Sequence, residues 1–462
     1  MGKSILIKGG RVIDPASGLD GIRDILIRDG KIERIIPQNE PEKKASGNDP
    51  GNDEGENRNE ENRNEENRDE LNCDGLNRVD EIIDASGMIV APGFVDVHVH
   101  FRDPGFTQKE DIFTGARSAA KGGYTSVVMM ANTNPTIDNT ETLKYVLEKG
   151  KQTDINIYAC ANVTIGMKGE TLTDMETLAK AGAVGFTDDG IPLVKEEIVL
   201  EAMKRSKALG MPLSFHEEDP SVIENNGINR GKASEYFGIG GSPRQAEINM
   251  VSRDIELAKK TGAIIDIQHI STKEGVELVR QAKAAGVNIH AEATPHHFSL
   301  TEEAAIEHGT LAKMNPPLRE EADRQAIVRG LADGTIDMIA TDHAPHTAEE
   351  KSREITKAPS GIIGLETALP LAIEYLVDSN EMKLQDVLAA MSTNPAKLYK
   401  LDAGYIKAGG PADLCIFDPE AAYIYTKESI ASKACNSPFI GKKMTGKVCY
   451  TICRGKIVYS AD

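Results

Sequence analysis

Hydrophobic and polar positions follow two different patterns along this chain and divide it into three regions. Residues 1–92 contain short strands of alternating apolar and polar side chains, separated by Gly and Asp turns, as β-hairpins do. Residues 93–400 instead alternate apolar strand runs with helical stretches, several of which end in glycine. Short strands return in residues 401–462. Because one pattern flanks the central region on both sides, we expect the two chain ends to build a single small β-sandwich.

The central region contains eight apolar runs, with helical stretches between them. They cover residues 93–100, 125–132, 155–164, 183–189, 211–218, 263–271, 288–296 and 337–346. Eight strand-helix units are the pattern of a TIM barrel. No glycine-rich dinucleotide fingerprint follows any of these runs. The predicted fold class is therefore α/β, a (β/α)8 TIM barrel over residues 93–400 with a β-sandwich domain built from both chain ends.

One segment of the N-terminal region fits neither pattern. Residues 41–78 are of low complexity, and residues 48–70 hold ten acidic and three basic residues and no aliphatic ones. Such a composition buries too little apolar surface to offset the entropy lost on ordering. We interpret residues 41–78 as a disordered insertion between strands.

Composition and charge exclude several classes of protein. The net charge of −19 is opposite to the clustered Lys and Arg of a nucleic-acid surface. No apolar run approaches the ~18 residues of a membrane span, and the N-terminus lacks a secretory layout. We therefore expect a cytoplasmic protein that binds a small molecule. An anionic substrate would need local positive charge to bind.

Ionisable residues gather where the predicted barrel strands end. Functional groups of a TIM barrel lie at the C-terminal ends of its strands. A single histidine there is more often a hydrogen-bonded structural residue than a ligand, but a group of buried ionisable residues needs partners or a metal. Four imidazoles and two carboxylates exceed one tetrahedral ion and suit two metals that share a bridge. The candidates are His98, His100, Asp188 or Asp189, His216, His269 and Asp342.

With these residues in view, the sequence resembles the cyclic amidohydrolases of the amidohydrolase superfamily, most closely the dihydroorotase family of the long, bacterial and archaeal type. The resemblance implies that His98 and His100 bind one metal with Asp342, and that His216 and His269 bind a second. It implies Zn²⁺, two ions per subunit, with Mn or Co as substitutes. The motifs that carry the resemblance are "DVHVHFRDPG", "MMANTNP", "GFTDDG", "SFHEE", "IQHIS", "KMNPPLR", "ATDHAPH" and "SGIIGLET".

The bridging ligand separates the subfamilies. Hydantoinases and allantoinases resemble this chain but use a carboxylated lysine at the end of strand four. Here that strand reads "GFTDDG", and the next lysine, Lys195, lies too far along the chain to replace it. We predict Asp189 as the bridge, because its interval to His216 fits the dihydroorotase pattern, with Asp188 behind it.

The same resemblance supplies substrate contacts and a reaction. It places Arg102, Asn132 and His346 around a substrate carboxylate, and a guanidinium suits bidentate capture of that group. Asn315 and the backbone of Gly361 are candidate contacts to the ring amides. The implied reaction is the reversible cyclisation of N-carbamoyl-L-aspartate to L-dihydroorotate, with Asp342 as the catalytic acid and base.

Two other readings stay open on the sequence alone. One is another cyclic amidohydrolase of the allantoinase or hydantoinase type, and the other is an inactive dihydroorotase-like scaffold. From the resemblance we also expect a homo-oligomer and an association with aspartate transcarbamoylase. Among the neighbouring acidic residues, we interpret Asp96 as a support for a ligand imidazole, and Glu217 and Glu218 as rim charges.

Overall fold

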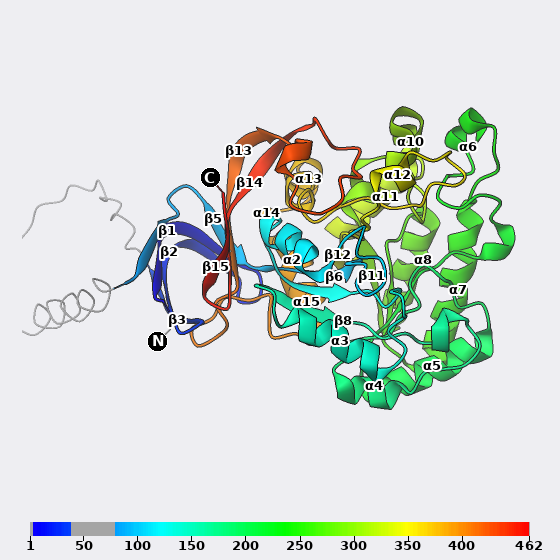
Figure 1. The fold of residues 1–462 in the computed structure, drawn as a ribbon, viewed down its shortest axis with the longest axis horizontal. Coiled ribbons are helices and arrows are strands. Elements are labelled where there is room, and N and C mark those ends of the chain that lie inside the picture. The colour runs from blue at the N-terminus through cyan, green and yellow to red at the C-terminus, as the bar shows by residue number, and fades with distance from the viewer. Residues whose placement is uncertain (1–2, 38–78, 462) are drawn as a thin grey trace, which may run out of the picture.

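The structure, a computed structural model, describes residues 3–37 and 79–461. Strands from the two ends of the chain form a β layer on one side, and a barrel ringed by helices lies beside it (Figure 1). The fold is α/β with a TIM barrel and a small β-sandwich made by both chain ends, as the sequence predicts. The predicted insertion at residues 41–78 lies outside the described residues.

The chain-end strands form one eight-stranded sheet in the order β15-β14-β13-β5-β1-β2-β3, with β4 paired to β1. Strand β5 joins the two chain ends, because it pairs in parallel with β1 and antiparallel with β13. Ile7, Ile25, Val90 and Leu414 are fully buried in the core of this sheet. The strands are β1 (Ile5–Asp14), β2 (Leu19–Arg28), β3 (Lys31–Pro37), β4 (Glu81–Asp84), β5 (Ile89–Pro92), β13 (Leu414–Ile424), β14 (Lys443–Cys453) and β15 (Lys456–Ser460).

The barrel strands are parallel and fall into two runs, β6-β7-β8 and β9-β10-β11-β12. Phe186 joins the runs on one side by bridges to Ala161 and Leu213, and Val99 bridges His343 on the other, which closes the barrel. The strands are β6 (Phe94–Val99), β7 (Tyr124–Met129), β8 (Asn156–Ala159), β9 (Leu213–Phe215), β10 (Ile265–Ile267), β11 (Ile289–Ala293) and β12 (Met338–Ile339).

The predicted fourth strand is shorter than expected. Over residues 183–189, Phe186 makes the two bridges, and the backbone pairing extends from the Val184 N–H, which donates to the Ala159 carbonyl at 3.1 Å, to the Thr187 N–H, which donates to the Ala161 carbonyl at 2.9 Å. A turn follows at once, in which the Ile191 N–H donates to the Asp188 carbonyl at 2.9 Å. This turn carries the two aspartates out of the strand direction at the barrel mouth.

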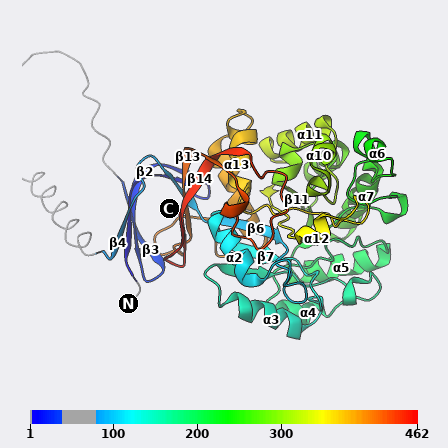
Figure 2. The same cartoon turned by 45° about the horizontal axis from the view of Figure 1, so that its top comes forward.

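Helices cover the outside of the barrel (Figure 2). Four of them, α4 to α7, end at a left-handed glycine, as the sequence predicts for several helices. In the described part of the chain, no helix has both the length and the apolar character that crossing a membrane requires. The helices are α2 (Ile112–Lys121), α3 (Thr140–Gly150), α4 (Met175–Ala181), α5 (Glu196–Leu209), α6 (Lys232–Phe237), α7 (Arg244–Thr261), α8 (Lys273–Ala284), α9 (Pro295–Ser299), α10 (Glu303–His308), α11 (Glu321–Ala332), α12 (Ala348–Lys351), α13 (Ala368–Ala372), α14 (Leu384–Leu388) and α15 (Asn394–Leu398).

Strand β6 shows how the sequence aims side chains at the site. Side chains of a strand alternate between its faces. Val95 and Val97 belong to a buried cluster that includes Leu398 of α15. Asp96 and His98 alternate with these valines and are also fully buried. A strand of this kind therefore holds ionisable groups in the interior, where each of them needs a partner.

We expect Gly123→Ala to destabilise the protein, because Gly123 lies where the barrel meets the chain-end sheet. Its φ is +90°, and a Cβ there would lie 2.6 Å from Cys415 Sγ and 2.9 Å from two ring atoms of Phe94. Overpacking of this kind costs about 1–3 kcal/mol in the free energy of unfolding. Urea unfolding measures the loss. Gly286→Ala is the matched control, because Gly286 has a φ of +77° but open space around it. Equal losses in the two variants would contradict the steric explanation.

Candidate metal centre

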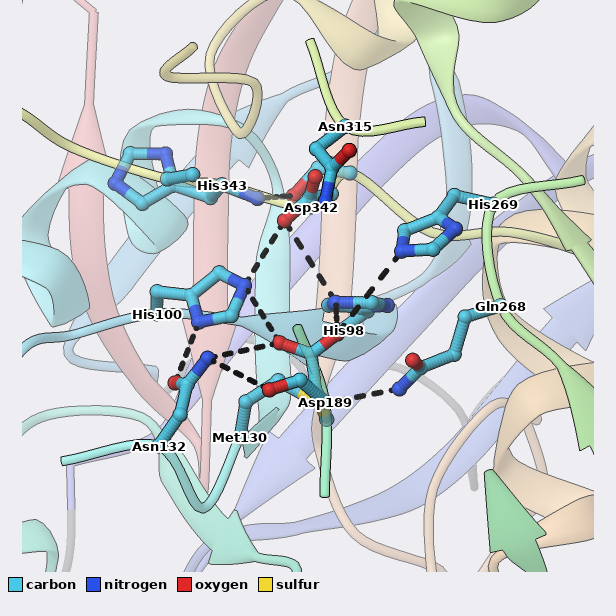
Figure 3. A network of polar contacts seen from close by, with 12 residues as sticks. His98, His100, Met130, Asn132, Asp189, Gln268, His269, Asn315, Asp342 and His343 are labelled. Atoms are coloured by element: carbon cyan, nitrogen blue, oxygen red, sulfur yellow. Dashed lines mark hydrogen bonds and ion pairs between the residues drawn. The ribbon is translucent and has the colours of Figure 1, made fainter. Parts of the chain in front are cut away.

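The six predicted metal ligands meet at the barrel mouth, although they come from five separate parts of the chain. Figure 3 shows five of them, which are His98, His100, Asp189, His269 and Asp342. Two come from β6 and the residue after it, and the others follow the Phe186 segment, β9, β10 and β12. All six side chains are buried. They are His98, His100, Asp189, His216, His269 and Asp342.

Two carboxylates stand between the first two imidazoles. His100 Nε2 lies 2.9 Å from Asp342 Oδ1 and 3.4 Å from Asp189 Oδ2. His98 Nε2 lies 3.4 Å from Asp189 Oδ1 and 3.6 Å from Asp342 Oδ1. Both imidazoles therefore face the same pair of carboxylates.

The other two imidazoles approach the same aspartate. His216 Nδ1 and His269 Nε2 lie 3.8 Å and 3.9 Å from Asp189 Oδ1, and 3.0 Å from each other. Asp189 thus turns one oxygen toward three imidazoles and the other toward His100. A carboxylate in this place can join two ions.

The neighbouring aspartate points elsewhere. Asp188 Oδ1 accepts hydrogen bonds from the Val163 N–H at 2.9 Å and from Asn162 Nδ2 at 3.2 Å. Its carboxylate thereby anchors the loop after β8. Lys195 is exposed at the start of α5 and does not line the site.

The donor set fits divalent metal ions. Two groups of three, His98 with His100 and Asp342, and His98 with Asp189 and His269, each have their ligand atoms within 4.8 Å of one another. His98 Nε2 is buried and makes no hydrogen bond to any residue that the structure describes. Imidazole nitrogens and carboxylate oxygens are the ligands of Zn²⁺ and related ions. His216 lies beside these groups rather than within one.

The electrostatics of the centre favour a cation. Burial by itself would lower the pKa of His98, but the carboxylates of Glu292 and Asp189 raise it well above its ordinary value. Burial would raise the pKa of Asp189, but the imidazoles of His98 and His100 lower it below its ordinary range. Positive charge is therefore stabilised at the point where the ligand atoms meet.

Sequence reasoning missed the carboxylates behind the imidazoles. Glu292 Oε2 lies 2.9 Å from His98 Nδ1, and Glu218 Oε2 lies 3.2 Å from His216 Nε2. Carboxylates that hold the second ring nitrogen of a ligand histidine fix its orientation. A signal existed for both: Glu292 is an acidic residue in the apolar run 288–296, and Glu218 follows His216 by the two-residue period of a strand.

The interpretation of Glu217 and Glu218 as rim charges is wrong, because the two side chains are only 3% and 2% exposed. Asp96 bonds the backbone of the strand and makes no hydrogen bond to the His98 ring among the described residues. Its Oδ1 accepts the backbone N–H of His98 at 3.0 Å and that of Thr341 at 3.2 Å, so it ties β6 to the end of β12. Burial raises the pKa of Asp96 to about 7.

All five predicted substrate contacts line one cavity of about 210 Å³ beside the ligands. Arg102 Nη2 and His346 Nε2 lie 3.4 Å apart on its wall. His346 Nε2 also lies 2.8 Å from the Ser360 carbonyl, which can only accept a hydrogen bond, so this nitrogen carries the proton. The five are Arg102, Asn132, Asn315, His346 and Gly361.

The two asparagines of this cavity contact predicted ligand side chains. Asn132 Oδ1 lies 3.0 Å from His100 Nδ1, and its Nδ2 donates to Asp189 Oδ2 at 2.9 Å. Asn315 Nδ2 lies 3.1 Å from His216 Nε2, while its Oδ1 is buried without a hydrogen bond to the described residues. The Asn132 carboxamide therefore holds the His100 ring and the Asp189 carboxylate, whereas Asn315 Nδ2 lies beside a His216 nitrogen that faces the Glu218 carboxylate.

Three residues of the site have backbone angles in the left-handed region. Arg102, His269 and Asp342 have φ values of 59°, 32° and 46°. Such residues cost of order 1–3 kcal/mol each and persist only where the surrounding structure holds them. The strain turns these side chains from the strand ends into the barrel mouth.

The chain is similar to known proteins in both sequence and structure. Residues 87–275 match the family model described as dihydro-orotase-like. Curated proteins named dihydroorotase from Clostridioides difficile and Streptococcus pneumoniae are 53% and 48% identical to this chain. Each alignment covers 99% of this chain and 100% of the relative. The solved structure of an L-hydantoinase (dihydropyrimidinase) from Arthrobacter aurescens is 25% identical and covers 100% of this chain and 96% of its own, with a TM-score of 0.81.

Adjacent aspartates allow a sharp test of the bridge. We expect Asp189→Asn to lower metal retention at least about tenfold, because it removes the charge that faces four imidazoles. Asp188→Asn should keep the metal and lose about 1–3 kcal/mol of stability, since its carboxylate binds backbone N–H groups. Metal analysis after dialysis and urea unfolding measure the two effects. Loss of metal in Asp188→Asn alone would reverse the assignment.

Proposed function

This chain belongs to the dihydroorotase family, and on that premise we infer that it catalyses the reversible cyclisation of N-carbamoyl-L-aspartate to L-dihydroorotate in pyrimidine biosynthesis. The observation that carries this choice among the cyclic amidohydrolases is the position of Asp189. A carboxylate that faces four imidazoles stands where hydantoinases and allantoinases are expected to carry a modified lysine. The retention of all six candidate ligands argues against an inactive scaffold.

We propose that the centre holds two Zn²⁺ ions per subunit, with Mn or Co as substitutes. His98, His100 and Asp342 would bind one ion, His216 and His269 the other, and Asp189 would join them. Bound metal of this type polarises an amide carbonyl and lowers the pKa of water toward neutrality. Glu292 and Glu218 would orient the imidazoles from behind.

Arg102 and His346 are proposed to bind the carboxylate of the substrate. The guanidinium can donate two hydrogen bonds to one carboxylate. His346 Nδ1 lies 3.4 Å from Lys109 Nζ, while its Nε2 carries the proton beside Arg102. Burial, with Arg102 and Lys109, lowers the pKa of His346, so the ring is neutral. Arg102 and Lys109 thus supply the local positive charge that an anionic substrate needs in a chain with a net charge of −19.

Asp342 is proposed to move the proton. Its side chain lines the cavity and lies 2.9 Å from His100 Nε2, so it reaches both the candidate ligands and the space for the substrate. In the hydrolytic direction it would take a proton from the attacking water and give it to the leaving ring nitrogen. In ring closure the same carboxylate would carry the proton the other way.

Asn132, Asn315 and Gly361 complete the proposed substrate site. Asn315 Oδ1 is the open acceptor among them for a ring N–H. The Gly361 N–H already donates to the Lys313 carbonyl at 2.8 Å. Contacts from the Gly361 backbone to the ring therefore stay a prediction, as do a homo-oligomer, an association with aspartate transcarbamoylase and a cytoplasmic location.

The direct test is the reaction of the purified chain with divalent metal. We expect it to interconvert carbamoyl aspartate and dihydroorotate, and to turn over hydantoin or allantoin far more slowly. The absorbance of the dihydroorotate ring follows both directions. Asp342→Asn should lower kcat by about 10²- to 10⁴-fold per bound metal, since it removes the proton carrier. An inactive wild-type protein that holds its metal would contradict the proposed function.

Arg102 variants test the substrate site separately. We expect Arg102→Gln to raise KM about 10- to 100-fold with a smaller change in kcat, because charged hydrogen bonds to the substrate carboxylate are lost. The KM of Arg102→Lys should lie between those of the wild type and Arg102→Gln, since lysine keeps the charge but loses the planar guanidinium. Initial rates over a range of carbamoyl aspartate concentrations give both constants. An unchanged KM in both variants would remove Arg102 from the site.

A further inference from the structure

A segment from the C-terminal part of the chain reaches the barrel mouth. Residues 430–437, which we call the strap, lie between β13 and β14 of the chain-end sheet and run across to the barrel (Figure 1). The proposed chemistry uses none of its residues. Its contacts nevertheless end at the wall of the substrate cavity.

Two buried glutamates of the barrel anchor the strap. Glu366 Oε1 accepts the backbone N–H groups of Ala431 at 2.9 Å and Ser432 at 3.2 Å. Glu110 accepts the Lys433 N–H at 3.2 Å and the hydroxyl of Ser432. Hydrogen bonds from backbone N–H groups to charged carboxylates are stronger than neutral ones. The strap is therefore fixed to the barrel before it reaches the site.

From this fixed segment, the Asn436 side chain joins two loops of the site. Its Oδ1 accepts the His346 backbone N–H at 3.0 Å, and its Nδ2 donates to the carbonyls of Ala344 and Gly361, each at 3.0 Å. The Asn436 backbone carbonyl accepts the Ile363 N–H at 3.1 Å. The side chain is 3% exposed, so water cannot readily replace these bonds.

The three residues that this carboxamide joins all line the substrate cavity. Ala344 and His346 follow β12, whereas Gly361 lies on the far side of α12. Only a carboxamide offers one acceptor and two donors in a single plane. An aspartate would keep the bond to the His346 N–H but turn a carboxylate oxygen toward two carbonyl oxygens.

We propose that Asn436 is a positioning residue for the substrate. It holds the His346 backbone against the Gly361 loop, and so fixes the imidazole and the Pro345 carbonyl, which lie 3.4 Å from the Arg102 guanidinium that would bind the substrate carboxylate. This inference rests on the proposed function, because it assigns a role toward the same substrate. The chain-end domain thereby supplies part of the substrate site through the strap.

The test compares Asn436→Ala and Asn436→Asp with Ser437→Ala in the metal-loaded full chain. Ser437 is a buried neighbour in the strap, and its hydroxyl accepts only the Phe439 N–H among the described residues. We expect both Asn436 variants to raise the KM for carbamoyl aspartate about tenfold or more, because misplaced donors lose the substrate. The change in kcat per bound metal should stay below about threefold, and Ser437→Ala should match the wild type.

A second measurement does not depend on turnover. Hydrogen–deuterium exchange of peptides from residues 344–363 should be faster in both Asn436 variants than in the wild type and in Ser437→Ala. If Asn436→Ala and Asn436→Asp do not fold, Asn436→Ser replaces them, since its hydroxyl can still bond one of the three groups.

Three results would overturn the proposal. They are a wild-type KM in the folded Asn436 variants, unchanged exchange in residues 344–363, and a fall in kcat that follows loss of metal while KM stays constant. The proposed function fails on a different result, which is a wild-type chain that holds its metal but does not interconvert carbamoyl aspartate and dihydroorotate.

Discussion

Buried charge at the barrel mouth is the constraint on which the rest of this structure depends. Four imidazoles and two carboxylates lie within a few ångströms of one another, and all six side chains are buried. Such groups cannot stay ionised and buried unless they are paired or bind a metal. Asp189 pairs with the imidazoles because it faces all four of them, and bound metal ions would stabilise the remaining buried charge.

The surroundings of the centre follow from the same demand. Each buried imidazole has a second ring nitrogen that needs a partner, and Glu292, Glu218 and Asn132 supply partners for three of them. These contacts leave the rings one orientation, with a nitrogen toward the centre. Asp96 serves the backbone instead, by tying β6 to the end of β12 where the barrel closes. Rigid support of this kind lets strained residues such as Asp342 persist.

Two segments of the chain connect the chain-end sheet to the site in the barrel. Strand β5 leads directly into β6, so the sheet that joins the two chain ends also fixes the start of the strand that carries His98. The strap returns from the same sheet to the loops beside the cavity, where Asn436 bonds three backbone groups. The site is thus bounded by segments from the beginning, middle and end of the described chain.

The sequence by itself determined the fold class and the types of side chain at the barrel mouth, because strand periodicity is local and places alternate residues on one face. It also showed an aspartate pair and no lysine at the end of strand four. The sequence already favoured Asp189 over Asp188, and the structure places Asp189 toward the imidazoles. Only the tertiary structure decided that Glu217 and Glu218 are buried and that Asn436 reaches the site. These facts depend on which distant segments cover a residue once the barrel closes, and local periodicity carries no information about that.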